Sequence, residues 1–211
     1  MFSRAPYISP MFEQVPKTLD FSSGFTGRMI VAMPHLADTP FAESVCLICS
    51  HSEDHAFGVI VNKPMQELDL GDVVDELEIQ CAPGRADTPV FFGGPVDLQR
   101  GAVLHSLDYR QDDTMLITPS LGLTASRDAL RTLCHNGDDA PRQAVLVMGH
   151  AGWTAGQLDE EVKRNDWLTI DAMPGLVFGA SSDAWSGALH QLGITDLTRL
   201  DGRERFAPLP H

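Results

Sequence analysis

The sequence predicts an α/β protein of the α+β type, in which short strands and short helices follow one another irregularly. Apolar runs such as "SVCLICS" are rich in residues that favour strands and are bounded by turn-forming residues. Other segments repeat apolar residues every three or four positions, as amphipathic helices do. The segments do not alternate regularly as strand, helix and strand, which argues against a Rossmann sheet.

Strands are predicted where an apolar run stops at a turn. The first run ends at Pro34, and the next two are joined by the polar segment "SHSEDH", which is typical of a hairpin loop. Gly93, Gly94 and Pro95 form a turn that divides one long run into two strands. The expected strands cover 27–34, 44–51, 56–64, 89–106 with its turn, 114–120, 143–149, 166–171 and 175–180.

Helices are predicted from apolar spacing and from end signals. Leu70, Val73, Val74 and Leu77 have the spacing of one helix face, and Asp69 before them is a suitable N-cap. Serines are suitable N-caps for two later helices, at Ser126 and Ser182. The expected helices cover 69–79, 126–137, 154–165 and 182–193.

The charge balance of the 211-residue chain limits the classes of partner. Fifteen basic residues against 29 acidic residues give a formal net charge of −14. Affinity for DNA and RNA comes largely from lysines and arginines that neutralise phosphates, and the chain has no run of such residues. We therefore expect no direct binding of nucleic acid and no binding to anionic membranes.

Residues 1–20 are expected to form an N-terminal extension, and residues 21–211 to form a single domain. Prolines interrupt the first twenty residues, so they do not resemble a signal peptide. No window approaches the roughly 18 apolar residues that a membrane-spanning helix needs. The expected location is the cytoplasm.

The four cysteines are expected to be reduced thiols. Cys46 and Cys49 lie three positions apart in an expected strand, so their side chains point to opposite faces and cannot share a metal. Cys81 and Cys134 are expected to stand alone. The sequence indicates no metal site and no cofactor.

The segment "VLVMGHAGWTAGQLDEEVKRNDWL", residues 145–168, is called the signature segment below. Gly149, Gly152 and Gly156 surround an expected strand-to-helix turn, whose backbone N–H groups could face an anion. The turn matches neither a dinucleotide fingerprint nor a P-loop, and three acidic residues follow it closely. We interpret it mainly as a hinge of the fold, with anion binding as the alternative.

The helix of the signature segment carries its own end signals. Thr154 and Gln157 fit a capping box, in which each side chain bonds the backbone N–H of the other residue. Acidic residues precede basic ones by four positions, which suits ion pairs along the helix. These pairs are Asp159 with Lys163 and Glu160 with Arg164.

The signature segment resembles the "GYAGWGAGQLE" motif of the YqgE/AlgH family. The segments "GRMIVAMPHLADTPFAESVCLICSH", "FGVIVNKP" and "FFGGPVDLQRGAVLHS" resemble further family motifs in the same order, the last as a hairpin. His150 stands where the family usually has tyrosine, and Thr154 where it often has a small residue. The resemblance implies a bifurcated mixed sheet, partly closed into a small barrel and flanked by short helices. It also implies a bacterial protein without an assigned reaction, from a family in which some members are labelled as transcriptional regulators.

Three turns supply the candidate ligand-binding residues. Lys63 ends an expected buried strand and can bind an anion, although such a lysine also pairs with acids and its neighbour Asn62 favours turns. The glycine turns at 93–94 and 149–156 are the other two. The candidate set is Asn62, Lys63, Gly93, Gly94, Gly149, Gly152, Trp153, Gly156 and Gln157.

No catalytic residue is predicted. His51 and His55 have the spacing of a helical metal pair, but they lie in an expected loop, where this spacing loses its meaning. His105 is expected to be a hydrogen-bonded core histidine. The chain has no G-x-S-x-G nucleophile motif, and no carboxylate pair can be placed across one bond.

The leading hypothesis is a cytosolic binding or regulatory module that acts through a protein partner or a small ligand. A second hypothesis is a small-anion binder or enzyme, with a site formed where the "NKP", "GGP" and "GHAGWTAGQ" turns meet. A third is a transcriptional regulator, whose effect the net charge of −14 makes indirect. Direct DNA binding is the weakest alternative.

Overall fold

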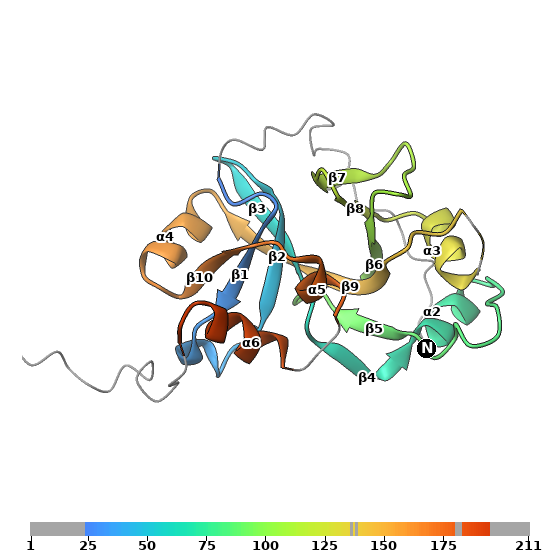
Figure 1. Ribbon diagram of the computed structural model, residues 1–211, viewed down its shortest axis with the longest axis horizontal. Coiled ribbons are helices and arrows are strands. Elements are labelled where there is room, and N and C mark those ends of the chain that lie inside the picture. Colours follow the sequence, from blue (N-terminus) through green and yellow to red (C-terminus); the bar gives the residue numbers. More distant parts are fainter. Residues whose placement is uncertain (1–23, 136, 138, 180–182, 195–211) are drawn as a thin grey trace, which may run out of the picture.

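The computed structural model describes residues 24–135, 137, 139–179 and 183–194 (Figure 1). The expected N-terminal extension 1–20 and the expected cap Ser182 lie outside these residues. The strands are β1 (Arg28–Ala32), β2 (Val45–His51), β3 (His55–Ile60), β4 (Pro64–Asp69), β5 (Pro89–Phe92), β6 (Val96–Ser106), β7 (Met115–Thr118), β8 (Leu121–Thr124), β9 (Ala144–Thr154) and β10 (Trp167–Asp171). The helices are the 3-10 turn η1 (Pro34–Leu36), α2 (Leu70–Glu76), α3 (Arg127–Cys134), α4 (Gln157–Lys163), α5 (Pro174–Val177) and α6 (Ala184–Gln191).

The sheet branches at β9, which runs across the centre of Figure 1 between two groups of strands. The main path has the order β10-β1-β2-β3-β9-β6-β8-β7, and β5 pairs with β9 off this path and with β4. The first half of β9 pairs with β5 in parallel and with β6 antiparallel, whereas residues 151–154 pair with β3. This arrangement confirms the predicted α+β class and the branched, mixed sheet.

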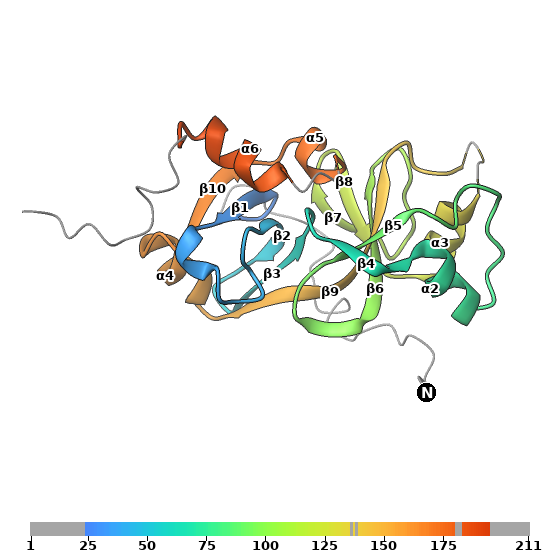
Figure 2. The ribbon, with the colours of Figure 1, turned by 90° about the horizontal axis from the view of Figure 1, so that it is seen from below.

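The sheet is curled but not closed. β10 and β7 are the two ends of the main path. Met115 and Ile117 of β7 nevertheless pack in the same apolar cluster as Val45 and Leu47 of β2, which lies far away in the strand order. The curl therefore buries one sheet face on itself, and α5 and α6 cover part of the same cluster through Val177 and Trp185 (Figure 2).

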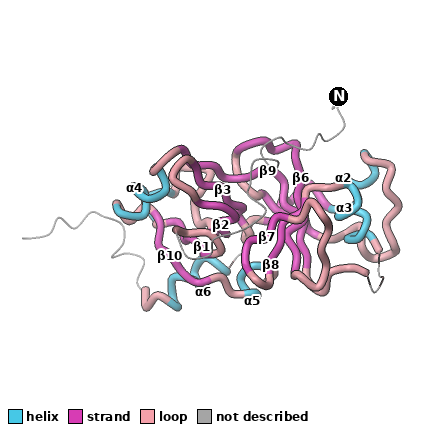
Figure 3. Tube along the Cα trace, turned by 90° about the horizontal axis from the view of Figure 1, so that it is seen from above, coloured by secondary structure: helices cyan, strands magenta, loops and turns pink. Residues whose placement is uncertain are grey.

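The helices lie on the outside of the curled sheet (Figure 3). α2 and α3 pack on a second apolar cluster at one end, and α4 covers a third cluster at the opposite end. The predicted N-caps at Asp69 and Ser126 are confirmed: Asp69 accepts the Asp72 N–H at 3.0 Å and Ser126 accepts the Ala129 N–H at 3.2 Å. Side-chain capping thus fixes the first turns of α2 and α3.

Several elements differ from the sequence prediction, and β8 and η1 have no predicted counterpart. The expected strand 175–180 is the short helix α5 over its first residues, since Pro174 at the first helical position starts a turn there. Residues 65–68, which lay between the predicted strand 56–64 and the predicted helix 69–79, belong to β4. The strand expected to stop at Gly149 continues to Thr154, because β3 offers a new partner to its second half.

The branch point is a close crossing of two backbones. β9 lies between β5 and β6, so these two strands do not pair as the predicted hairpin would. The chain that joins them crosses β9 at Gly93 and Gly94, and Gly93 donates its N–H to Met148 O and accepts the Ile60 N–H, both at 2.8 Å. A Cβ on Gly94 would lie 2.2 Å from the His150 carbonyl carbon, and a Cβ on Gly149 would lie 2.5 Å from Gly94 O. The crossing therefore has room only for glycine.

Gly149 and Gly156 provide a matched test of this crossing. Both have left-handed backbones, with φ of 73° and 67°, but a Cβ on Gly156 would meet nothing within 4 Å. We expect Gly156→Ala to lower the free energy of unfolding by about 1–2 kcal/mol through backbone strain alone. Gly149→Ala should lower it by about 2–5 kcal/mol, because overpacking is added to the strain. Urea unfolding measures both free energies, and equal losses would show that the crossing backbone does not add overpacking at Gly149.

Candidate functional site

The signature segment forms the second half of β9, α4 and β10, and a shared carboxylate links all three. Glu161 Oε2 accepts the indole N–H of Trp153 at 2.8 Å and that of Trp167 at 2.9 Å. Both indoles are buried, and Phe41 stacks on Trp153 and meets the edge of Trp167. A buried indole N–H is costly without an acceptor, so Glu161 holds α4 against the two strands on either side of it.

The predicted capping box is half correct. The Gln157 Oε1 accepts the Thr154 N–H at 3.0 Å, as predicted. The Thr154 hydroxyl, however, donates to the same Oε1, since Thr154 ends β9 and Gly156 is the N-cap of α4. Gln157 Nε2 donates to Glu161 Oε1 at 2.8 Å, so Gln157 extends the Glu161 network to the strand end.

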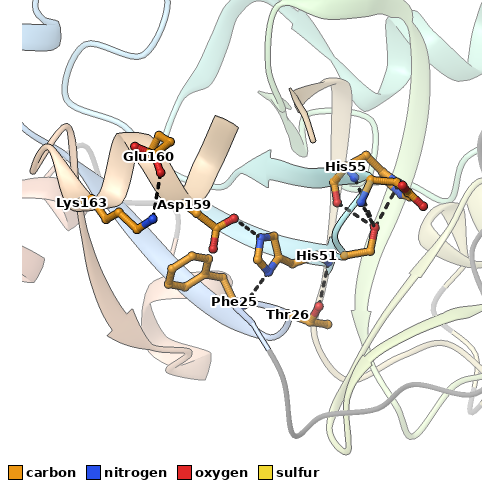
Figure 4. A network of polar contacts seen from close by, with 9 residues as sticks. Phe25, Thr26, His51, His55, Asp159, Glu160 and Lys163 are labelled. Carbon is orange, nitrogen blue, oxygen red and sulfur yellow. Dashed lines mark hydrogen bonds and ion pairs between the residues drawn. The ribbon is translucent and has the colours of Figure 1, made fainter. Parts of the chain in front are cut away.

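His51 ties the end of β2 to α4 and to the turn before β1 (Figure 4). Its Nδ1 accepts the Phe25 N–H at 3.2 Å, and its Nε2 lies 3.0 Å from Asp159 Oδ2. Since Nδ1 is an acceptor, Nε2 carries the proton that Asp159 accepts. Asp159 is therefore engaged by His51 rather than by Lys163, which bonds Glu160 instead.

Asn62 and Lys63 lie at the end of β3, where both side chains bind backbone. The Asn62 amide accepts the Val45 N–H and donates to Glu43 O, each at 2.8 Å. Lys63 Nζ donates to Pro40 O at 2.9 Å, and burial lowers the pKa of its ammonium group. Both residues thus brace the 37–44 loop, and their role in ligand binding stays a prediction.

The three candidate turns meet at the centre of the molecule. Phe92 donates its N–H to Lys63 O, and Gly93 and Gly94 lie directly on Gly149 and His150. This meeting is a contact between backbones, because a methyl group at Gly93, Gly94 or Gly149 would strike main-chain atoms. Gly152 and Gly156 are exposed and away from these contacts, and Trp153 points to Glu161. Packing thus explains the central glycines without a ligand.

A hollow of about 250 Å³ lies elsewhere, between α3 and the start of β9. Arg85 and Arg142 line it, together with Gln143 and the Phe178 ring. Asp108 accepts the Arg142 N–H at 2.9 Å and lies 3.7 Å from its Nε. A hydrogen bond from Ser106 lowers the pKa of Asp108, and the Arg142 side chain beside this carboxylate is 88% exposed. The full lining is Arg85, Thr132, Leu133, Ala140, Pro141, Arg142, Gln143, Ala144 and Phe178.

Sequence reasoning missed this hollow. Its polar residues Arg85, Arg142 and Gln143 come from turn-rich loops that carry no apolar period and no known motif. The available signal was weak: two arginines in loop segments of a chain that has only 15 basic residues.

The cysteines are partly as predicted. Cys46 and Cys49 are buried in different apolar clusters on opposite faces of β2, and burial raises the pKa of both thiols. Cys81 and Cys134, expected to stand alone, lie beside each other, because the loop after α2 packs on the end of α3. Sequence separation concealed this contact.

Three further features concern His105, metal ligation and membrane-spanning helices. His105 is buried, with Nε2 2.9 Å from the Thr124 hydroxyl and Nδ1 3.0 Å from Ser106 O, which confirms a hydrogen-bonded core histidine. Within the described ranges, no three His, Cys, Asp or Glu side chains are placed to hold a metal ion. No helix among the described residues is long and apolar enough to cross a membrane.

Comparison with known proteins agrees with this architecture. The AlgH-like family model matches residues 29–196. A UPF0301 protein of Paracoccus denitrificans is 42% identical over 183 residues, which cover 85% of this chain and 95% of that protein. A UPF0301 protein of Rhodospirillum rubrum is 40% identical and covers 85% and 94% of the two chains.

Two solved structures share the fold. The solution structure of the AlgH protein from Pseudomonas aeruginosa has a TM-score of 0.70 at 31% identity, over 90% of this chain and all of that one. A crystal structure of a Corynebacterium diphtheriae protein has a TM-score of 0.63 at 23% identity, over 88% and 94% of the two chains, and shows likeness of fold alone.

The molecule is an α+β protein in which two groups of strands share the strand β9. The glycine turns and the signature segment lie at or beside this branch. The chain belongs to the AlgH-like family, whose UPF0301 relatives are uncharacterised bacterial proteins.

Removing the shared carboxylate should destabilise the fold. We expect Glu161→Ala to lower the free energy of unfolding by about 2–6 kcal/mol, because two indole N–H groups lose their acceptor at about 1–3 kcal/mol each. The exposed Glu160→Ala should leave it almost unchanged, since its partner Lys163 is also exposed and solvent screens the pair. Urea unfolding followed by tryptophan fluorescence measures both, and similar losses would show that the indoles do not depend on Glu161.

Proposed function

We propose that this protein is a binding module for a small anionic ligand, held in the hollow between α3 and the start of β9. The observation that carries the proposal is the lining of this hollow. Among the residues that the structure describes, this lining includes Arg85 and Arg142 and no acidic residue, histidine, lysine or cysteine. Such a lining can bind charge but offers no side chain for general acid or base catalysis.

The donors in the hollow suit a carboxylate or a phosphate. Guanidinium groups present several N–H donors in one plane and match the oxygens of both anions. The Gln143 side chain adds amide groups, and the Phe178 ring adds an apolar wall. A volume of about 250 Å³ is just under the roughly 300–1,000 Å³ of typical ligand sites, which favours a small ligand over a nucleotide-sized one.

Local charge favours an anion here in spite of the acidic chain. The net charge of −14 is spread over the molecule, whereas two arginines face one hollow. Charges more than about 8 Å away are largely screened at physiological ionic strength, so the local charge is set mainly by Arg85, Arg142 and the Asp108 carboxylate beside Arg142. A regulatory role would follow if the bound state changes how a protein partner recognises the α3 end of the molecule.

Inorganic phosphate is a suitable first probe. We expect it to raise the melting temperature of the wild-type protein more than that of the Arg85→Gln, Arg142→Gln double variant, because only the wild type binds it specifically. Phosphate also stabilises proteins by general exclusion, so the difference between variants is the readout.

The matched control is Arg131→Gln, an exposed arginine of α3 outside the hollow, paired with Asp128. It should keep the full response to phosphate. An equal response in the wild type and the double variant would contradict the proposed site and favour a protein partner as the main mode of action.

Direct DNA binding is not expected, and any regulatory effect on transcription would be indirect. In a gel-shift assay at low salt, a mixed-sequence DNA duplex should keep its free mobility at every protein concentration, because a chain of net charge −14 cannot release counterions from many phosphates. A retarded band that disappears as salt rises would overturn this expectation.

A further inference from the structure

Cys81 and Cys134 form a contact that neither the fold nor the proposed anion site requires. Cys81 lies partly exposed in the loop after α2, and Cys134 is buried in the last turn of α3. Both side chains pack in the same apolar cluster, where burial and the nearby Cys81 raise the pKa of the Cys134 thiol. Ala82 also donates its N–H to Cys134 O at 2.8 Å, so the two backbones meet at the same point.

This geometry suits a covalent bond. Disulfides join residues whose Cα atoms lie about 4.4–6.8 Å apart, and the hydrogen bond from Ala82 to Cys134 brings the backbone beside Cys81 against Cys134. The Ala82 bond also holds the loop against the end of the helix.

We propose that Cys81 and Cys134 are a reversible redox pair that closes to a disulfide when the protein meets hydrogen peroxide. The proposal goes beyond anion binding and does not depend on it. Thiol pairs of this kind in reducing compartments are transient and regulatory rather than permanent.

The two cysteines have different parts in the reaction. Burial and the neighbouring Cys81 raise the pKa of the Cys134 thiol to about 12, whereas Arg85 acts in the opposite direction. Cys134 is therefore a poor first nucleophile, and the partly exposed Cys81 meets the oxidant first.

The chemistry balances with one peroxide. The Cys81 thiolate attacks a peroxide oxygen, the O–O bond breaks, and the departing hydroxide takes a proton to leave as water. Cys81 is then a sulfenic acid. Cys134 attacks the Cys81 sulfur, the S–O bond breaks, and the second hydroxide leaves as water with the Cys134 proton. Two thiols are oxidised to one disulfide while one hydrogen peroxide is reduced to two waters.

The other two cysteines do not compete. Cys46 and Cys49 are fully buried in different clusters, and burial raises the pKa of both thiols. They are protonated and screened from solvent, so they provide an internal control for oxidation that requires unfolding.

A disulfide between Cys81 and Cys134 would affect both the hollow and the stability of the fold. It would join the 77–88 loop to the end of α3, and these two segments supply Arg85, Thr132 and Leu133 to the hollow. Closing a loop of some fifty residues restricts the unfolded chain, so oxidation should raise the melting temperature.

The test uses the reduced full-length protein and a small excess of hydrogen peroxide, followed by alkylation and intact mass measurement. We expect a loss of about 2 Da, the two hydrogens of one disulfide, and two fewer alkylated thiols. Peptide mapping should place the bond between Cys81 and Cys134. Dithiothreitol should restore the mass, and oxidation should raise the melting temperature.

Two single variants distinguish the steps. Cys134→Ser should stop at a sulfenic acid on Cys81, which dimedone traps, and Cys81→Ser should lose neither hydrogen. Circular dichroism checks that both variants fold. Oxidation of wild-type Cys81 to a sulfinic acid while Cys134 stays free would overturn the proposal, as would a bond to Cys46 or Cys49 or two unreacted thiols in the folded protein.

Discussion

The fold depends on one backbone crossing, where Gly93 and Gly94 pass over Gly149 and His150. A strand can pair with only one neighbour on each edge, and β9 must serve β5, β6 and β3. The left-handed Gly149 lies between the half of β9 that pairs with β5 and β6 and the half that pairs with β3. Gly93 links the two groups of strands, because it donates its N–H to Met148 O and accepts the Ile60 N–H. Without an approach this close, the two groups of strands could not share one strand.

The Glu161 network helps to cover the far end of β9, beyond the branch. A strand that continues past the branch needs cover on its outer face, and α4 supplies it through Leu158. One carboxylate bonds an indole from each flanking strand, so the helix is held by directional contacts as well as by apolar packing. The residues of the signature segment therefore work as parts of one structural joint.

The sequence allowed the α+β class to be predicted, together with most elements, because local apolar period and capping determine them. Asp69 and Ser126 are such cases, since their cap bonds lie within three residues. Long-range partners are not encoded locally. The continuation of β9 beyond Gly149 depends on β3, and the contact of Cys81 with Cys134 depends on the packing of α2 and α3. The segment 175–180 failed because a short apolar run does not distinguish a strand from one helical turn after Pro174.

The candidate site was harder to predict than the fold for a related reason. Glycines and tryptophans stand out in a sequence, and in this molecule their positions are explained by the crossing and by the Glu161 joint. Arg85 and Arg142 come from loops without a pattern and meet only when α3 and β9 pack. The thiol pair lies beside the same loop, because the 77–88 loop carries both Cys81 and Arg85. The arginines of the proposed site and the thiol pair thus lie at the α2 and α3 end of the molecule. The glycines and tryptophans that stand out in the sequence maintain the branched sheet instead.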